Sequence, residues 1–439
     1  MAIFRPLLSC GIFSIPVGVM LMFVLRWSEL VTSFIPGTIH LAGNLLIIDF
    51  LQYWISLICL LIIILSTQAS FQDSRSFNRS QLKILFVANF YLVIIFIGTQ
   101  NIFNLFIIFE ISIIPIFIII LGWGYQPEKI KAAYALFFFT AVSASPIVVI
   151  LTYFFMGGSS MFLPELRRYF HYRFYGEALN FMLLCGFLVK LPIYGLHLWL
   201  PLAHVEAPVY GSIILAGILL KLGGLGILRL NSVITARSIF NTFIIVSLLG
   251  LALIGAICIY TTDLKKIIAF SSVSHIAFTI VFLIGVNKVR GVSCILIMIS
   301  HAFRSSGIFL IVYLFYLSTN SRNILVSIGI LTIYPHVAFL WLIIVISSIG
   351  GPPAINLLAE VWCVIYSFTL FYKIFLLIVL GFILSRAYHI ILYSSVCQRD
   401  SSWYLRSFRV NTISRSFGTL CLFHVIFTTY LCTLISSFI

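Results

Sequence analysis

Leu188-Val-Lys-Leu-Pro192 places a lysine and a proline inside an apolar stretch of the sequence. A second interruption, Pro352-Pro353, precedes Glu360 by about two helical turns in the other half of the chain. Proline lacks a backbone donor and disfavours helical geometry at the preceding residue, so Pro192, Pro352 and Pro353 are predicted to break their helices. In membrane proteins, paired broken segments beside ionisable residues indicate an ion or substrate site near the middle of the bilayer. The pattern therefore favours transport.

The composition is typical of an integral membrane protein. Hydrophobic residues make up 62% of the 439 residues, charged residues make up 8%, and the mean hydropathy is +1.18. A helix of about 20 apolar residues spans a bilayer, and runs of that length predict about thirteen or fourteen transmembrane helices. We therefore expect an all-α polytopic chain with one membrane domain over residues 1–439, its core at about 83–396 and peripheral helices in 1–82 and 397–439.

The apolar runs also give approximate helix positions. We expect helices at residues 7–25, 50–67, 83–99, 102–122, 132–155, 179–199, 207–229, 239–260, 266–286, 291–315, 373–396 and 417–437, and a broken span at 337–370. Residues 29–48 are ambiguous, because Pro36, Gly37, His40 and Gly43 interrupt an apolar stretch that either lies at the interface or crosses the membrane.

The charge distribution points to lipid as a partner. The formal charge of +15 comes from 26 Lys and Arg against 11 Asp and Glu, and most of the excess lies in short connections such as 75–83, 167–173 and 399–415. Basic residues scattered over loops suit anionic phospholipid and argue against a nucleic-acid partner. Alternate loops are both basic, so the positive-inside rule does not assign an orientation.

The sequence contains no motif for a cofactor or a metal. Its nine cysteines lie singly in apolar surroundings without a Cys-x-x-Cys pair, which is typical of small buried hydrophobic residues. Gly223, Gly224 and Gly226 lack the context of a phosphate loop and are expected to allow close helix packing. His197, His204 and Glu206 match no standard metal spacing and are interpreted as interfacial polar groups. Any electron carrier is therefore expected on another chain.

Four charged residues are predicted to lie within the hydrocarbon region: Glu110, Lys190, Lys221 and Glu360. Each costs about 2.5 to 3.5 kcal/mol on insertion scales, so each is expected to have a partner or a function. Two structural alternatives remain open. Glu110 could be a protonated cap of a backbone carbonyl, and Lys190 could snorkel to the interface.

Two histidines in neighbouring predicted helices are further candidates for proton transfer. His275 follows Ser271-Ser272-Val273-Ser274, and His301 follows Ser300, so hydroxyl groups that can hold water lie near both imidazoles. Imidazole titrates near neutral pH, which suits a proton relay. A single histidine in a membrane can equally make a structural hydrogen bond between helices, and the sequence does not decide between the two roles.

The run from Leu188 to Pro208, together with Leu219-Leu-Lys-Leu-Gly-Gly224, resembles the NADH-ubiquinone oxidoreductase chain 4 family, the mitochondrially encoded antiporter-like subunits of respiratory complex I. Further matching motifs are Trp123-Gly-Tyr-Gln-Pro-Glu128, Thr262-Asp-Leu-Lys-Lys266 with Ser271–His275, and Pro352–Glu360. Together they cover about residues 110–360.

The resemblance implies a proton-translocating subunit of NADH:ubiquinone oxidoreductase with inverted repeats and no redox centre, in the mitochondrial inner membrane. Flavin, iron-sulfur clusters and ubiquinone would belong to other subunits, and further antiporter-like subunits would be neighbours. By motif position, the relay would comprise Glu110 as the modulating glutamate, Lys190 as the lysine of the broken helix, Lys221 as the connecting lysine, His275 and His301 as relay histidines, and Glu360 as the terminal residue.

The sequence departs from the family pattern at three places. Leu202 stands where lysine is common, Gly122 stands where arginine often precedes Trp123, and Arg304 lies in a run that is usually richer in hydroxyl groups and glycine. Arg304 either raises a barrier to proton transfer or pairs with a carboxylate. Two other functions also remain open: a subunit of a multi-subunit cation/proton antiporter, and an assembly scaffold without transport.

Overall fold

The structure, a computed structural model, describes residues 39–41, 46–48, 50–72, 78–158, 160–166, 177–230, 237–283, 288–352, 354–370 and 375–398. The helices predicted at 7–25 and 417–437, as well as Pro353, lie outside the described residues. Within the described part, eight helices are long and apolar enough to cross a membrane.

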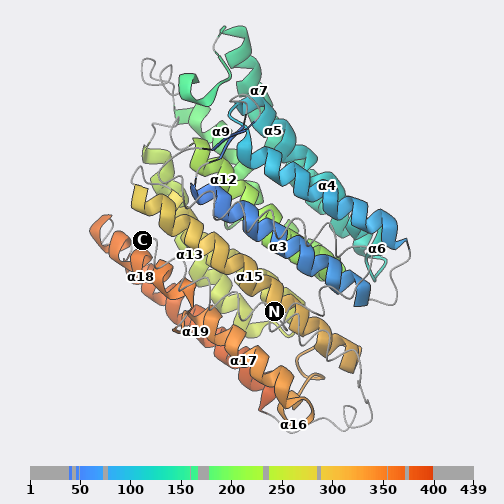
Figure 1. Ribbon diagram of the computed structural model, residues 1–439. Coiled ribbons are helices and arrows are strands. Elements are labelled where there is room, and N and C mark those ends of the chain that lie inside the picture. The colour runs from blue at the N-terminus through green and yellow to red at the C-terminus, as the bar shows by residue number, and fades with distance from the viewer. Residues whose placement is uncertain are drawn as a thin grey trace.

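The described chain is almost entirely helical, and Figure 1 shows most of its helices running side by side in one bundle. The helices are α3 (Phe50–Gln72), α4 (Arg79–Gly98), α5 (Ile102–Ile111), α6 (Ile113–Trp123), α7 (Lys129–Met156), α9 (Glu177–Lys190), α10 (Trp199–Glu206), α11 (Val209–Ile214), the π-helix η2 (Leu215–Leu219), α12 (Leu220–Leu230), α13 (Arg237–Tyr260), α14 (Leu264–Leu283), α15 (Lys288–Thr319), α16 (Ile330–Ile333), α17 (Pro335–Ile349), α18 (Ile355–Leu370) and α19 (Phe375–Cys397).

The helices differ in how far the protein encloses them. In the spans Val209–Leu230 and Leu264–Leu283, 89% of the residues of one 18-residue stretch are buried, and in Ser293–Thr319 all residues of such a stretch are buried. The corresponding share is 39% in both Arg79–Gly98 and Lys129–Met156. The outer helices expose apolar side chains, which suits contact with lipid or with other apolar protein surfaces. The three enclosed spans carry Lys221, His275 and His301, so the candidate relay residues lie in the middle of the bundle.

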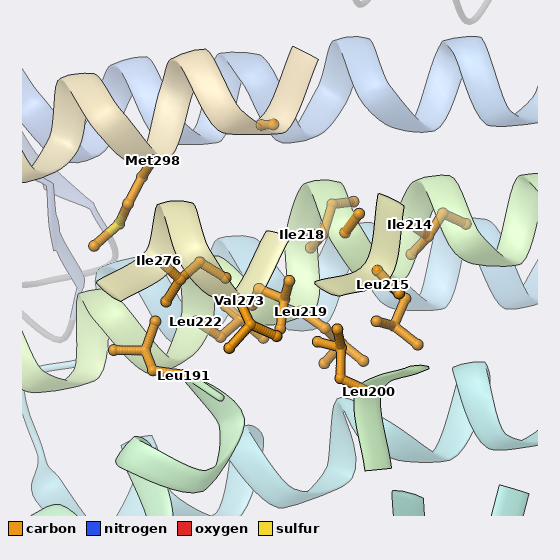
Figure 2. Packing of buried hydrophobic residues seen from close by; sticks show 14 of the residues in the cluster. Leu191, Leu200, Ile214, Leu215, Ile218, Leu219, Leu222, Val273, Ile276 and Met298 are labelled. Carbon is orange, nitrogen blue, oxygen red and sulfur yellow. The ribbon is translucent and has the colours of Figure 1, made fainter. Parts of the chain in front are cut away.

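Close packing in the middle of the bundle depends on the glycines of α12. A Cβ atom at Gly223 would lie 3.0 Å from the carbonyl oxygen of Phe187, so α9 approaches α12 too closely for a side chain. The prediction that these glycines allow close helix packing is therefore confirmed. Around them, Leu191, Leu222 and Met298 interlock in the apolar core (Figure 2).

Two features differ from the expected all-α chain. In the ambiguous stretch, β1 (Ile39–Leu41) pairs antiparallel with β2 (Leu46–Ile48), with Ile39 opposite Ile48. Isoleucine is β-branched and favours extended structure. A prediction based on the length of apolar runs does not distinguish isoleucine from other apolar residues. The helix predicted at 102–122 is divided at Ser112 into α5 and α6.

The described cysteines agree with their interpretation as apolar residues. Each is a free thiol, and all except the half-buried Cys185 are buried. Those that the structure describes are Cys59, Cys185, Cys258, Cys294, Cys363 and Cys397.

Candidate functional site

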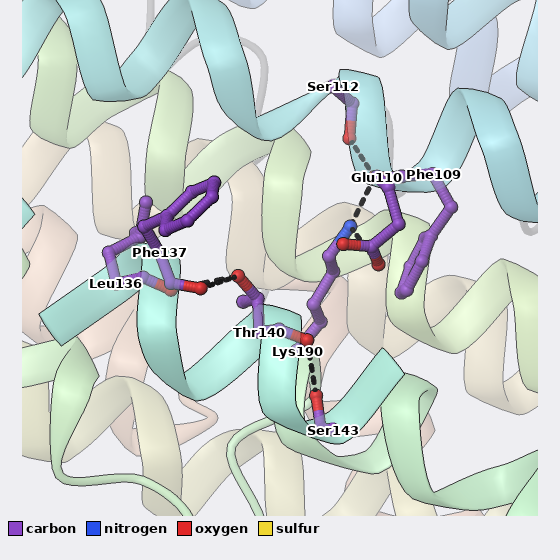
Figure 3. Close-up of polar contacts among 8 residues, drawn as sticks. All are labelled: Phe109, Glu110, Ser112, Leu136, Phe137, Thr140, Ser143 and Lys190. Atoms are coloured by element: carbon purple, nitrogen blue, oxygen red, sulfur yellow. Dashed lines mark hydrogen bonds and ion pairs between the residues drawn. The ribbon is translucent and has the colours of Figure 1, made fainter. Parts of the chain in front are cut away.

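The buried Lys190 forms an ion pair with the partly buried Glu110, although 80 positions separate them in the sequence. The Nζ atom of Lys190 lies 3.7 Å from Oε1 of Glu110, and the side chains are 3% and 27% exposed, respectively. The ammonium also donates to the carbonyl oxygen of Phe109 and lies 3.2 Å from the centre of the Phe109 ring. Figure 3 shows the side chain of Lys190 pointing toward Glu110 and Phe109. Lys190 therefore does not snorkel to the surface of the chain.

The backbone carbonyl that accepts a hydrogen bond from Lys190 lies next to the division between α5 and α6. The hydroxyl of Ser112 donates to the carbonyl oxygen of Phe109 at 2.7 Å, so one oxygen serves both Ser112 and Lys190 (Figure 3). Pro115 follows closely and has no backbone donor for the preceding turn. The carbonyl end of α5 thus carries a partial negative charge beside the ammonium.

Lys190 is also the last residue of α9, and an irregular segment connects it to α10. The indole nitrogen of Trp199 donates to the carbonyl oxygen of Val189 at 3.1 Å, and the amide of Ile193 donates to Leu188 at 3.4 Å. These bonds satisfy carbonyls that a continuing helix would have bonded. The lysine is therefore held at the C-terminal end of a helix, where a cation is stabilised.

Lys221 and His301 form the second contact of the site. The Nζ atom of Lys221 lies 2.9 Å from Nδ1 of His301 and also donates to the carbonyl oxygen of Ala216, which belongs to η2. A π-turn shifts backbone bonding by one residue, and such turns often occur at functional sites. None of the ion pairs found among the described residues includes Lys221, so imidazole and a backbone dipole solvate this ammonium.

His301 belongs to a chain of three histidines. Its ring centre lies 6.3 Å from that of His275, which lies 5.6 Å from that of His389 on α19. Tyr388 packs against His389 with ring centres 4.3 Å apart, and its hydroxyl lies 3.1 Å from that of Ser274. Sequence reasoning missed His389 and Tyr388, because α19 carries no pattern that distinguishes them from other polar residues of an apolar helix.

Glu360 lies in the second turn of α18 and forms the third group. Its carboxylate accepts a hydrogen bond from the amide of Asn356 and lies 3.8 Å from the guanidinium of Arg386. The buried guanidinium of Arg304 donates to the carbonyl oxygen of Ser348 at 3.3 Å, near the end of α17, and its charge interacts with that of Glu360. Sequence reasoning missed Asn356 and Arg386 as partners of the glutamate.

The structure thus gathers the sequence-derived residues into three groups: Glu110 with Lys190, Lys221 with the histidines, and Glu360 with its amide and guanidinium partners. Within the described part of the chain, no hydrogen bond or ion pair joins one group to the next. A proton that passes between groups therefore needs bridging water or a side-chain movement.

Gly350 has a left-handed backbone conformation and leaves room for the carboxylate of Glu360, and its replacement by alanine is expected to destabilise the chain. Gly350 ends α17 with φ +80°, and an added Cβ would lie 2.7 Å from Oε2 of Glu360. The left-handed conformation alone costs a residue with a side chain about 1 to 2 kcal/mol. We expect a lower melting temperature for Gly350→Ala in the purified protein.

Gly122→Ala is the matched control for this change. A Cβ at Gly122, in α6, would meet nothing within 4 Å, and alanine favours a helix over glycine by about 1 kcal/mol. Equal melting temperatures for the two variants would contradict the left-handed conformation of Gly350.

His197, His204 and Glu206 each contact a different partner: Tyr194, Phe309 and Arg322, respectively. Among the described residues, no group of three His, Cys, Asp or Glu side chains is placed to hold a metal. Glu206 pairs with Arg322 at 3.6 Å and borders a polar cavity of about 630 Å³. His204 is fully enclosed and stacks on Phe309 with ring centres 4.8 Å apart. His204 therefore packs inside the bundle, and its interfacial position stays a prediction.

Lys265 is a buried lysine that sequence reasoning did not select. It is 4% exposed and donates to the carbonyl oxygens of Val205 at 3.3 Å and Ala207 at 3.1 Å. These carbonyls lie at the C-terminal end of α10, where a cation is favourable. Lys266 lines the polar cavity instead, so the adjacent lysines occupy different environments.

The bundle and its buried ionisable groups define a polytopic membrane protein of the antiporter-like class. The chain belongs to the NADH:quinone oxidoreductase/Mrp antiporter transmembrane family, whose model matches residues 99–386. It is 37% identical to NADH-ubiquinone oxidoreductase chain 4 of Artemia franciscana over 76% of this chain and 84% of that protein. It is 39% identical to the protein of the same name from Locusta migratoria, over 68% of this chain and 67% of that protein.

A solved structure supports the same fold. A chain of respiratory complex I from Thermus thermophilus with bound NADH superimposes with a TM-score of 0.81, covering 95% of this chain and 90% of that chain at 17% identity. The resemblance inferred from the sequence motifs is therefore confirmed at the level of the family.

Proposed function

We propose that this chain is a proton-translocating membrane-arm subunit of respiratory NADH:ubiquinone oxidoreductase. Family membership and the names of its relatives support this role. The observation that carries the proposal is the buried Lys190 and its ion pair with the partly buried Glu110 at 3.7 Å, since a charge enclosed in an apolar bundle is costly unless it has a function. As a subunit, the chain takes part in the enzyme without holding a redox centre.

The proposed relay begins with a change at the ion pair. Glu110 stabilises the ammonium of Lys190 while the carboxylate is ionised and nearby. When quinone reduction in another subunit neutralises or moves this carboxylate, the ammonium loses its counter-charge and gives a proton to water. Lys221, His301 and His275 then pass protons on through water-mediated steps toward Glu360, which is the terminal group.

The intervals between α9 and α10 and between α17 and α18 are interpreted as breaks within two membrane spans. Pro192 and Pro352 lie in these intervals, as does Pro353 in the sequence, and proline cannot donate the bonds of a continuous helix. With the residues that the structure does not describe, the chain would have about thirteen or fourteen spans arranged as inverted repeats. Irregular backbone at these depths is favourable where it lines a polar path.

The proposed role also assigns partners and a location. Flavin, iron-sulfur clusters and ubiquinone would be held by other subunits of the complex, in the mitochondrial inner membrane. Apolar side chains on the outer helices, such as Val142 at 69% exposure and Ile383 at 58%, suit contact with further antiporter-like subunits or with phospholipid chains. The basic loops suit anionic headgroups, and nothing favours nucleic acid.

Purification and reconstitution test the proposal against both alternatives. A tagged form of the chain is expected to copurify with flavin and iron-sulfur clusters, and vesicles containing the complex should pump protons when supplied with NADH and ubiquinone. Sodium transport without any dependence on NADH would instead identify a cation/proton antiporter. An assembly scaffold predicts that neutralising Lys190 and Lys221 changes only the amount of complex, with an unchanged proton yield per NADH.

A further inference from the structure

His389 adds a third buried histidine to the pair His301 and His275 of the proposed relay. It lies on α19, is 3% exposed, and its ring centre is 5.6 Å from that of His275 on α14. This separation is shorter than the 6.3 Å between His275 and His301. A single water molecule can bridge polar groups at such separations.

One hydrogen bond fixes the chemistry of the His389 ring. Nδ1 lies 2.7 Å from the carbonyl oxygen of Ser385, one turn earlier in α19. A carbonyl oxygen only accepts, so Nδ1 carries a proton and donates it. In the neutral ring, Nε2 is therefore the atom with a free lone pair, and it can accept a proton without breaking this bond.

The groups around His389 connect the histidines with the terminal glutamate. Tyr388 packs on the ring, and its hydroxyl bonds to Ser274, one residue before His275. The guanidinium of Arg304 on α15 repels a positive charge on His275 and on His389 and attracts the carboxylate of Glu360, so it favours movement of a proton from the histidines toward the glutamate. Arg386, also on α19, pairs with Glu360 at 3.8 Å.

We infer that His389 is a further proton-relay residue of this chain, which receives a proton at Nε2 from His275 and passes it through water toward Glu360. The inference rests on the proposed function and adds to it a branch on α19. In the first step an N–H bond of protonated His275 breaks and an N–H bond forms at Nε2 of His389. In the second, the Nε2 proton leaves to water and an O–H bond forms on the carboxylate. Both histidines end neutral, so no oxidant or other reactant is needed.

The test compares His389→Gln with wild type in the assembled complex, reconstituted in vesicles and normalised to flavin content. Glutamine keeps a side-chain amide near Ser385 but cannot carry the additional proton. A positioned acid–base group contributes about 10²- to 10⁴-fold to a proton transfer, so we expect NADH-driven proton translocation to slow at least tenfold. His389→Asn is made in parallel, so that a packing failure of one amide variant leaves the test intact.

His336→Gln is the matched control, because His336 is an exposed histidine of α17 outside the cluster. It should pump at the wild-type rate. If His389→Gln or His389→Asn also pumps at that rate, the inference is overturned and the proposed function stands. If the wild-type complex does not pump protons with NADH, the proposed function fails, and the inference fails with it.

Discussion

Replacing Lys190 by methionine is expected to slow proton transfer through this chain by at least about a hundredfold, because an acid–base group in a relay contributes that much or more. Methionine is similar in length and apolar, so it fills the enclosed position without a charge. Loss of the lysine leaves Glu110 without the ammonium at 3.7 Å, whereas the carbonyl oxygen of Phe109 keeps Ser112 as its donor. The measurement is the number of protons translocated per NADH oxidised in reconstituted vesicles.

Lys190→Arg separates charge from proton release. Arginine keeps the positive charge and can still pair with Glu110, but it is effectively never deprotonated in proteins. We therefore expect the arginine variant to assemble well and still fail to translocate protons. A wild-type proton yield in the arginine variant would show that only the charge at this position matters, and would overturn the role of Lys190 as a proton carrier.

Lys131→Met supplies the matched control for this series. Lys131 is an exposed lysine of α7 that borders the polar cavity. Its replacement removes the same charge at a solvated position, where a single charge contributes little to stability. The proton yield of the control should equal that of wild type.

The sequence was sufficient to predict that Lys190 and Lys221 are buried, because about ten apolar residues lie on each side of each lysine, but it did not select the equally buried Lys265. It was not sufficient to predict their acceptors. Three buried cations end at helix C-termini: Lys190 at Phe109, Lys265 at Ala207, and Arg304 at Ser348. Each bond joins segments far apart in the sequence, so hydropathy and local spacing carry no information about it.

The other site residues were missed for the same reason, because their partners lie far away in the sequence. His389 and Arg386 lie in α19, whose sequence reads as an ordinary apolar span, and they become part of the site only because α19 packs near α14 and α18. The π-turn of η2 was equally hidden, since it depends on a one-residue change in hydrogen bonding within an apolar run. Tertiary packing therefore decides which residues can join the proposed relay, whereas the sequence indicates only which charges lie within apolar runs.

Lys221→Met and His301→Gln are expected each to slow proton transfer at least about a hundredfold, and the double variant is expected to be little worse than either alone. The two side chains meet at 2.9 Å, with 5% and 2% of their surfaces exposed, so each has the other as its neighbour in the relay. Groups that act in series as one unit give strongly non-additive effects, because the second loss removes a step that is already blocked.

Lys265→Met is the control that distinguishes a relay lysine from a buried lysine in general. Lys265 is as enclosed as Lys221 but bonds to the carbonyls of Val205 and Ala207. Its loss leaves these acceptors without the ammonium and should lower stability by about 1 to 3 kcal/mol, while the proton yield per assembled complex stays unchanged. Additive losses for Lys221 and His301, or an equal loss of proton yield in Lys265→Met, would show that burial of charge, and not the Lys221–His301 contact, governs proton transfer.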